Sequence, residues 1–264
     1  MEARALTGRR ALVTGSVAGL GAAMARALAE AGAAVMLTGL ERPDEVEPVR
    51  SALAADCGVE VGYAQADVAQ PAQIEALVRA TTQRLGGIDI LVNNAVVRHF
   101  APIEAFPVER WDAALAVNLS AAFHAIRLAL PGMRAGGYGR IVNMTSVYGS
   151  RGTANRVDYV TTKTAIQGLT RAVAMECLEG DVTCHALCPG AVLTPASEKR
   201  IEALMAQEGI GWDQAEHQFL EGKGPSRRFV KPESVARALL LLCGPVGRDM
   251  NGAILPVEGG WLAS

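Results

Sequence analysis

Arg10-Ala11-Leu12-Val13-Thr14-Gly15-Ser16-Val17-Ala18-Gly19-Leu20-Gly21 is a short apolar run that passes directly into a glycine-rich turn. An alanine-rich, helix-favouring stretch follows as far as Glu30 and stops at Gly32. This order predicts a strand over residues 10–14, a turn and then a helix. A helix N-terminus offers free N–H groups and a positive dipole to a pyrophosphate, and glycines let the backbone approach it closely. An ordinary turn is the alternative, but the strand, turn and helix together favour a nucleotide site.

The rest of the chain repeats this alternation of strand and helix. Further apolar strands are predicted over residues 33–38, 59–66, 88–93, 141–145 and 182–187, and helices over residues 44–55, 71–85, 108–134 and 158–178. Strands without polar alternation, separated by helices, imply a parallel sheet covered on both faces. The sequence therefore predicts an α/β fold, a Rossmann-type doubly wound parallel sheet, with residues 1–264 in a single domain.

Residues 194–228 interrupt the alternation. This segment is helical in composition and rich in charge, and Gly209, Gly211, Gly222 and Gly224 are possible hinges. It is interpreted as a small helical lid over the substrate. A plain pair of surface helices is the alternative, since helical insertions need not move.

The composition indicates a globular protein with small-molecule partners. Half of the 264 residues are apolar, which excludes a disordered chain. The 25 Lys and Arg nearly balance the 27 Asp and Glu, and no long run of one charge offers a footprint for nucleic acid. We therefore expect a small-molecule alcohol or ketone partner, and neither nucleic acid nor a membrane.

The cysteines, the histidines and the apolar runs indicate the compartment of the protein and bear on metal and membrane binding. Five scattered cysteines without a CxxC pair are expected to be free thiols in a reducing compartment. The four histidines show no HxxxH or HExxH spacing, so no metal site is predicted. The apolar run at residues 238–243 is far shorter than the roughly 20 residues that cross a bilayer. Residues 1–4 lack the apolar stretch of a signal peptide, so we expect a cytoplasmic protein.

Tyr159 and Lys163 form a candidate proton-transfer pair. Residues four apart on a helix share a face, with Cβ atoms roughly 5–6 Å apart. The pKa of a free tyrosine is about 10, and a nearby ammonium lowers it. Tyr159 could then exchange a proton with an alcohol or a carbonyl, and Ser146 lies upstream at the end of a β-prone run.

Several motifs together resemble the short-chain dehydrogenase/reductase family over almost the whole chain. They are the turn Thr14-Gly15-x-x-x-Gly19-x-Gly21, the run Asn93-Asn94-Ala95, Asn118, Ser146, Tyr159, Lys163 and Pro189-Gly190. The resemblance implies that Tyr159 is the catalytic acid and base, and that Lys163 lowers its pKa and binds the nicotinamide ribose. It also implies that Ser146 hydrogen-bonds the reacting oxygen, that Asn118 holds a water of the proton relay, and that Asp67 touches the adenine.

The same resemblance implies a nicotinamide dinucleotide cofactor. Its expected contacts are Thr14, Gly15, Ser16, Gly19, Leu20, Gly21, Gly39, Leu40, Asp67, Val68, Asn94, Ala95, Tyr159, Lys163, Pro189, Gly190, Val192 and Thr194. Gly39 stands where many NAD-dependent relatives have Asp, so the end of the second strand is ambiguous between NAD and NADP. Val96 replaces the glycine of the family pattern, which leaves a non-catalytic, dinucleotide-sensing homologue as an alternative.

Within the family, the chain resembles the bacterial D-3-hydroxybutyrate dehydrogenases. The resemblance rests on Phe106-Pro107, Asn118-Leu119-Ser120-Ala121, Val192-Leu193-Thr194-Pro195, Gly259-Gly260-Trp261-Leu262 and the segment over residues 127–134. Those relatives use NAD with Gly at the place of Gly39, which favours NAD here and leaves NADP as an alternative. A homotetramer is also implied, with residues 113–130 and 158–178 at the interfaces.

The expected substrate pocket differs from that of these relatives. Where they hold a small carboxylate with Gln, His, Lys and Gln, this chain has Arg98, Tyr148, Arg156 and Glu198. Arginines make bidentate contacts with carboxylate, sulfonate or phosphate groups. The expected substrate is an anionic hydroxy or keto compound that resembles 3-hydroxybutyrate without being it. The predicted substrate contacts are Arg98, Ser146, Tyr148, Arg156, Tyr159, Glu198 and Trp261. Solvated surface arginines, or an NADPH-dependent reductase of another ketone class, are the alternatives.

Overall fold

Seven parallel strands form one sheet in the order β3-β2-β1-β4-β5-β6-β7. The computed structural model describes residues 4–264, except for the side chain of Ala196. The strands are β1 (Arg10–Val13), β2 (Ala34–Gly39), β3 (Val61–Gln65), β4 (Ile90–Asn93), β5 (Gly139–Met144), β6 (Val182–Pro189) and β7 (Ile254–Val257). β1 pairs with β2 on one side and with β4 on the other, so the direction of winding reverses there. Ligands of such sheets bind at this switch point, outside the carboxyl ends of the strands.

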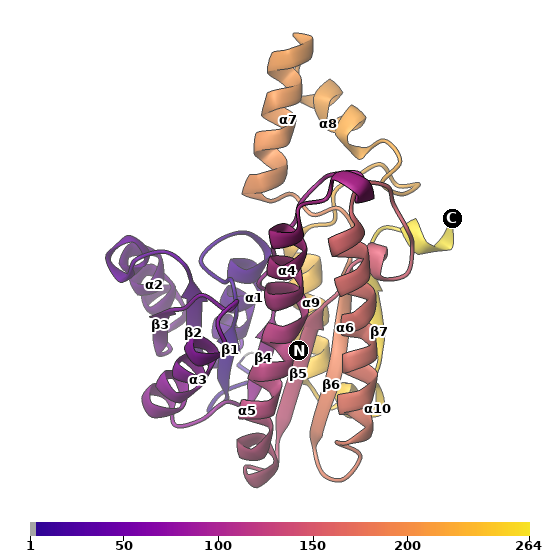
Figure 1. The fold of residues 1–264 in the computed structure, drawn as a ribbon. Coiled ribbons are helices and arrows are strands. Elements are labelled where there is room, and N and C mark those ends of the chain that lie inside the picture. The colour runs from indigo at the N-terminus through magenta and orange to yellow at the C-terminus, as the bar shows by residue number, and fades with distance from the viewer. Residues whose placement is uncertain (1–3) are drawn as a thin grey trace.

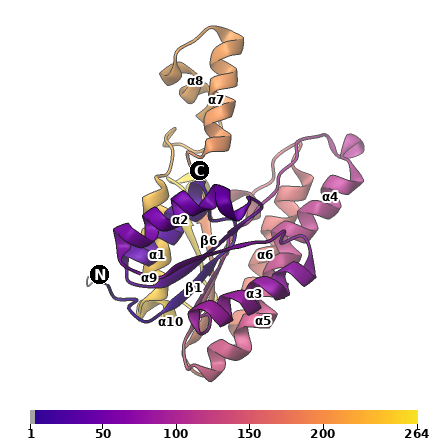
Figure 2. The same cartoon turned by 90° about the vertical axis from the view of Figure 1, so that its left-hand side faces the viewer.

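Helices cover both faces of the sheet (Figure 2). One face carries α1 (Gly19–Glu30), α2 (Pro43–Cys57) and α9 (Pro232–Cys243), followed by α10 (Val246–Asp249). The other face carries α3 (Pro71–Leu85), α5 (Ala121–Ala135) and α6 (Val157–Met175). Ala11 and Val13 pack in the first core and Leu12 in the second. Because successive strand residues point to opposite faces, burial of both faces requires the continuous apolar runs of the sequence.

The structure confirms the predicted Rossmann-type doubly wound sheet and its single domain. Strand β7 and helices α9 and α10 were not predicted. β7 has only four residues and contains Pro256, which cannot donate to a ladder. Pro256 is tolerated because β7 is the edge strand and pairs only with β6. The expectation that the chain begins without a signal peptide falls largely on residues 1–3, outside the described residues.

Helix α4 (Val108–Leu115) runs through a π-helical turn, η2 (Ala116–Ser120), into α5. The combined helix, Val108–Ala135, is long and apolar enough to cross a membrane by length and composition alone. Its α5 part packs against α3 and β4, and seven of its residues are buried there. In this fold it therefore serves as a core helix. The remaining short 3-10 helices are η1 (Ile103–Ala105), η3 (Val147–Gly149) and η4 (Trp261–Ala263).

Helices α7 (Pro195–Glu208) and α8 (Trp212–Leu220) stand away from the sheet, above its carboxyl edge (Figure 1). The Thr194 side chain caps α7 by accepting a hydrogen bond from the backbone N–H of Ser197. Gly209 ends the helix in the left-handed conformation, at φ 66°. These two helices occupy the segment interpreted from sequence as a lid.

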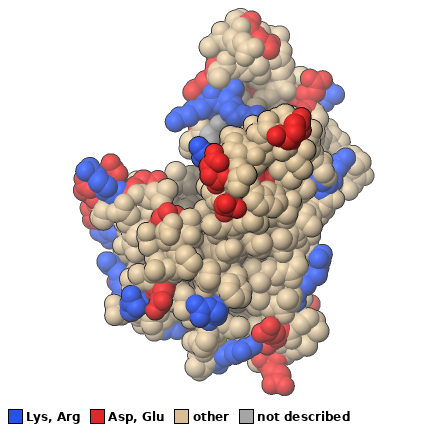
Figure 3. All heavy atoms as spheres, in the orientation of Figure 1, with Lys and Arg blue, Asp and Glu red and all other residues tan. Residues whose placement is uncertain are grey.

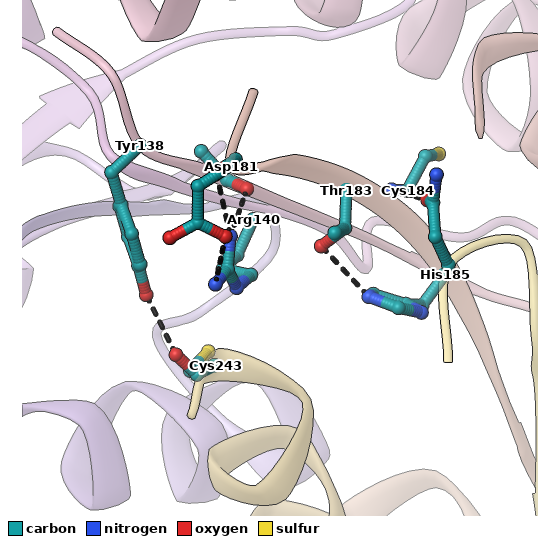
Figure 4. Close-up of polar contacts among 9 residues, drawn as sticks. Tyr138, Arg140, Asp181, Thr183, Cys184, His185 and Cys243 are labelled. Carbon is teal, nitrogen blue, oxygen red and sulfur yellow. Dashed lines mark hydrogen bonds and ion pairs between the residues drawn. The ribbon is translucent and has the colours of Figure 1, made fainter. Parts of the chain in front are cut away.

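Polar contacts lie around the first residues of β5 and β6, away from the carboxyl edge of the sheet (Figure 4). Arg140 at the start of β5 pairs with Asp181 at 2.7 Å, and the Tyr138 hydroxyl donates to the Cys243 carbonyl at 2.7 Å. Within β6, the His185 ring contacts the Thr183 hydroxyl at 2.8 Å. Burial, followed by the nearby Arg140 charge, lowers the pKa of His185 to about 4, so this ring is neutral at physiological pH.

Candidate active site

A cavity of about 810 Å³ opens at the carboxyl ends of the strands, beneath α7 and α8. Of the cofactor and substrate residues predicted from sequence, the following line it: Gly15, Gly19, Leu20, Gly21, Asn94, Ala95, Arg98, Ser146, Tyr148, Arg156, Tyr159, Lys163, Pro189, Gly190, Val192, Thr194 and Trp261. The structure does not place Thr14, Ser16, Gly39, Leu40, Asp67, Val68, Asn118 or Glu198 among the lining residues. Val96 lines the cavity as well.

The glycine turn is held rigidly at the N-terminus of α1. Gly15 has φ +61° and Gly19 φ +59°, which L-residues with side chains rarely adopt. A Cβ at Gly21 would collide with the Gly15 carbonyl and with Asn94 Nδ2. Asn94 Nδ2 donates to the carbonyls of Thr14 and Gly15, at 2.9 and 2.8 Å. The predicted Thr14 thus acts behind the turn, where its hydroxyl accepts from the backbone of Asn94 and Ala95.

The first turn of α1 carries neither a capping side chain nor an acidic residue. Its backbone N–H groups and its positive dipole are therefore available to an anion. The glycines beside it leave no Cβ between the backbone and the cavity. The residues present thus fit the pyrophosphate of a dinucleotide at this turn.

Glu41 lies beyond the end of β2 and lines the cavity on the glycine-turn side, although it was not among the predicted cofactor contacts. A Cβ at Gly39 would collide with the Glu41 carboxylate, so the glycine makes room for this side chain to fold back. Arg42 is engaged with Asp44 at 2.9 Å, and Leu40 is exposed. The Asp67 carboxylate accepts a hydrogen bond from the backbone of Ala69, at the end of β3.

Tyr159, Lys163 and Ser146 meet at the floor of the cavity. Tyr159 and Lys163 come from α6, and Ser146 follows β5 at the start of η3. The Lys163 ammonium lies 5.6 Å from the centre of the Tyr159 ring and donates to the Met144 carbonyl at 2.6 Å. All three side chains are buried. Their assembly follows from the parallel sheet, which brings the end of β5 beside the first turns of α6.

The charges around Tyr159 favour its phenolate. Burial raises the pKa of the Tyr159 phenol, but Lys163, then Arg98, the Ser146 hydroxyl and Arg156 together outweigh it. The net effect is a pKa below the ordinary value of a tyrosine. Burial also lowers the pKa of Lys163, and the Tyr159 phenolate opposes that shift.

Asn118 is buried in the π-helical turn between α4 and α5. Its amide exchanges two hydrogen bonds with the backbone of Val97, at 2.9 and 3.0 Å, and donates to Thr162 Oγ1 at 3.3 Å. The π turn displaces this side chain from the regular helix face. Asn118 therefore fixes the backbone next to Arg98 and joins it to α6.

Two arginines stack over Tyr159. Their guanidinium carbons lie 5.3 Å (Arg98) and 4.4 Å (Arg156) from the centre of the ring. The buried Nε of Arg156 has no hydrogen-bond partner in the protein. Among residues 4–264, neither arginine forms an ion pair with a carboxylate. Tyr148 packs edge-on against both Tyr159 and Trp261, closing the wall beside them.

Sequence reasoning missed Arg200, Lys223, Phe100, Phe219 and Phe229, all of which line the cavity. Figure 3 shows Lys and Arg side chains gathered where α7 and α8 meet the body of the molecule. Ser197 and Arg200 lie three residues apart on α7 and share the face toward the cavity. Glu198 points along a different face, so Arg200 and not Glu198 is the α7 charge in the cavity wall.

Within the part of the chain that the structure describes, no group of three or more His, Cys, Asp or Glu side chains could hold a metal ion.

The two ends of the cavity differ in chemistry. The glycine turn and Glu41 form one end, and the Tyr159 cluster with its cations forms the other. This arrangement can hold a dinucleotide and move a proton next to it.

Comparison with known proteins agrees with this geometry. A family model for short chain dehydrogenase matches residues 9–204. D-beta-hydroxybutyrate dehydrogenase of Cupriavidus necator is 42% identical over 98% of this chain and 99% of that protein. The enzyme of the same name from Rhizobium meliloti is 40% identical over 97% of this chain and 99% of its own length.

Solved structures agree as well. L-sorbose reductase from Gluconobacter frateurii, in complex with NADPH and L-sorbose, has a TM-score of 0.93 at 29% identity, with 98% of each chain covered. Levodione reductase has a TM-score of 0.88 at 31% identity, with 98% of this chain and 99% of that one covered. The chain belongs to the short-chain dehydrogenase family and is an NAD(P)-dependent oxidoreductase that acts on CH–OH groups.

Proposed function

We propose that this enzyme transfers a hydride between NAD(H) and the carbinol carbon of a small anionic hydroxy or keto acid. One observation carries the proposal: Tyr159, Ser146 and Lys163 share a cavity with a dinucleotide-fitting glycine turn and with Arg98 and Arg156, two arginines without a carboxylate partner. The relatives that are D-beta-hydroxybutyrate dehydrogenases support a 3-hydroxy acid as the substrate class.

The nicotinamide, when bound, accepts a hydride in the oxidation direction and supplies one in the reduction direction. In oxidation the Tyr159 phenolate takes the proton of the substrate hydroxyl as the carbonyl forms. Ser146 Oγ accepts a hydrogen bond from the Tyr148 backbone at 3.3 Å. Its hydroxyl also favours the Tyr159 phenolate, and when substrate is bound it is assigned to donate to the reacting oxygen. Lys163 keeps Tyr159 ionised and, on the family resemblance, binds the nicotinamide ribose.

Asn118 has a supporting role in this proposal. On the family resemblance it holds a water of the proton relay. Its side chain also fixes the backbone at Val97, which sets the position of the adjacent Arg98. Loss of Asn118 should therefore affect both proton transfer and the arginine wall.

Glu41 supports NAD over NADP. An acidic side chain near the end of the second strand accepts hydrogen bonds from the 2′-hydroxyl of the adenosine ribose and repels a 2′-phosphate. Arg42, the nearest cation in sequence, is turned toward Asp44 and Glu45 on α2. Substitution of Glu41 by Gln should therefore lower the ratio of kcat/KM for NAD to kcat/KM for NADP. An unchanged ratio would contradict this role of Glu41.

Arg98 and Arg156 are assigned to the anionic group of the substrate. Planar guanidinium groups make bidentate, charge-assisted bonds to a carboxylate. Both lie beside the Tyr159 ring, so an acid bound there presents its hydroxyl carbon near the phenol. Arg98 adds a positive charge where 3-hydroxybutyrate enzymes are expected to have Gln, and Arg156 is larger than the Lys expected there. These differences favour a related acid over 3-hydroxybutyrate itself.

The decisive experiment compares wild type with Tyr159→Phe across a panel of 3-hydroxy acids and ketones, following NADH at 340 nm. The substitution should abolish turnover, while calorimetric titration with NAD shows the cofactor still binding. Full activity of the variant would refute the role of Tyr159. A wild type that binds NAD but turns over no alcohol or ketone would favour a non-catalytic dinucleotide-binding protein.

The assembly and the location of the enzyme complete the proposal. Large apolar side chains are exposed on the single chain at Phe123 on α5, at Met175, the last residue of α6, and at Leu178 just after it. They support a homotetramer that buries the helices over residues 113–130 and 158–178.

All five cysteines are free, which supports a reducing, cytoplasmic location. Light scattering after size-exclusion chromatography tests the tetramer. Helices α7 and α8, within residues 194–228, are proposed to close over the bound substrate.

A further inference from the structure

Cationic and aromatic side chains alternate in a continuous array from Tyr159 out to the end of α8. The members of this cation–aromatic array are Tyr159, Arg156, Phe100, Arg200, Phe219 and Lys223. The Arg156 guanidinium lies 4.6 Å and the Arg200 guanidinium 5.0 Å from the centre of the Phe100 ring. Beyond it, Arg200 lies 5.2 Å and the Lys223 ammonium 3.2 Å from the centre of the Phe219 ring.

No carboxylate forms an ion pair with the cations of this array in the described residues, although the buried Asp158 acts on Arg156 from a longer distance. Within residues 4–264, none of Arg156, Arg200 and Lys223 forms an ion pair with Asp or Glu. The single acidic side chain among the described cavity residues is Glu41, at the glycine-turn end. The cations also repel one another, since burial first and then Arg200 and Arg156 lower the pKa of Lys223 to about 8. Like charges gathered in a cleft without counter-ions are typical of a ligand site.

The array contains more positive charge than one carboxylate satisfies. Arg98 and Arg156 at the inner end are enough for the anionic group of a monocarboxylic acid at Tyr159. Arg200 and Lys223 would then remain without a counter-ion. A guanidinium stacked on an aromatic face keeps its edge of N–H donors free, so Arg200 can still bind an anion bidentately.

We propose that Arg200 and Lys223 bind a second anionic group, so that the preferred substrate is a hydroxy or keto acid with anionic groups at both ends. The inference rests on the proposed function, in which Arg98 and Arg156 hold the first group. Arg200 belongs to α7 and Lys223 follows α8, whereas Phe100 and Arg156 belong to the body of the enzyme. The second group thus also links the helical protrusion to the body.

The test is a matched pair of six-carbon acids, 3-hydroxyhexanoate and 3-hydroxyadipate, which differ only in a terminal methyl or carboxylate. With NAD and detection at 340 nm, kcat/KM of the wild type should be at least about ten-fold higher for the dicarboxylate, as expected for a charge-assisted contact. Arg200→Gln and Lys223→Gln, singly and combined, should bring this ratio toward one. Lys199→Gln removes an exposed charge from the same helix outside the cavity and should keep the wild-type ratio.

The outcomes separate the two proposals. Turnover of both acids with a ratio near one in the wild type would overturn the second anion site and leave the proposed function standing. Turnover of neither acid would overturn both. A third substrate with a terminal phosphonate distinguishes the source of the charge: a preference for it over the dicarboxylate also supports the site and identifies the second group as phosphoryl-like. Thermal unfolding of each variant confirms that the compared enzymes are folded.

Discussion

Replacement of Arg156 by Met should weaken catalysis and leave the fold as stable as before, or more stable. Arg156 is largely buried, its Nε lacks a hydrogen-bond partner, and its charge has no carboxylate within ion-pair distance. Burial lowers the pKa of Arg156, and the Tyr159 phenolate opposes this shift only in part. The surrounding protein therefore does not fully compensate for burying this charge. Methionine keeps the apolar stem that packs against Phe100 and Tyr148.

The magnitude of the catalytic loss follows from the contact that Arg156 is assigned. A hydrogen bond to a charged group contributes about 1.5–3 kcal/mol. At about 1.4 kcal/mol for each factor of ten, Arg156→Met should lower kcat/KM for the anionic acid roughly ten- to hundred-fold. The pKa of Tyr159 should also rise, because Arg156 is the last and smallest of the groups that favour its phenolate.

The assay combines kinetics at 340 nm across pH with thermal unfolding. Arg79→Met, an exposed arginine on α3 outside the cavity and the proposed interfaces, is the matched control and should change neither quantity. A large loss of thermal stability in Arg156→Met, with kcat/KM retained, would refute the reasoning, because it would make Arg156 a structural residue.

Three further predictions concern other groups. Since the pKa of Lys223 is about 8, KM for a dianionic acid should rise above pH 8 in the wild type and stay low in Lys223→Arg. The pKa of His185 is about 4 in the fold against about 6.5 unfolded, so stability is full above pH 6.5 and falls by up to about 3 kcal/mol toward pH 4. Urea unfolding should show this slope in the wild type and not in His185→Gln. Val96→Gly removes a β-branched side chain from the cavity wall and should tighten NAD binding severalfold, measured by calorimetric titration.

The core architecture could be predicted because the position of each strand in the fold is visible in its local sequence as a continuous apolar run. A strand buried on both faces must be apolar throughout, and β1 shows this in Ala11-Leu12-Val13. The pairing of Tyr159 with Lys163 likewise depends only on helix geometry. β7 was missed because its four residues and Pro256 give no strand pattern, and only the neighbouring β6 stabilises it.

The outer part of the site could not be predicted because distant segments assemble it. Phe100 lies about a hundred residues before Arg200 and Lys223 in sequence, and it meets them only through the placement of α7 and α8. The resemblance to relatives predicted Glu198 as a substrate contact, but in the structure Arg200 and not Glu198 lines the cavity. Such residues acquire their role from packing geometry, which is absent from any local pattern.

Under the proposed preference for NAD, Gly39 and Glu41 together determine the coenzyme choice of this chain. Many NAD-dependent relatives place a carboxylate at position 39 itself, whereas here the carboxylate belongs to Glu41, two residues later, and folds back into the space that a Cβ at position 39 would occupy. The two positions are therefore epistatic: Gly39→Asp in the presence of Glu41 would set two carboxylates against each other, while the same change in a Glu41→Gly background would restore the usual arrangement.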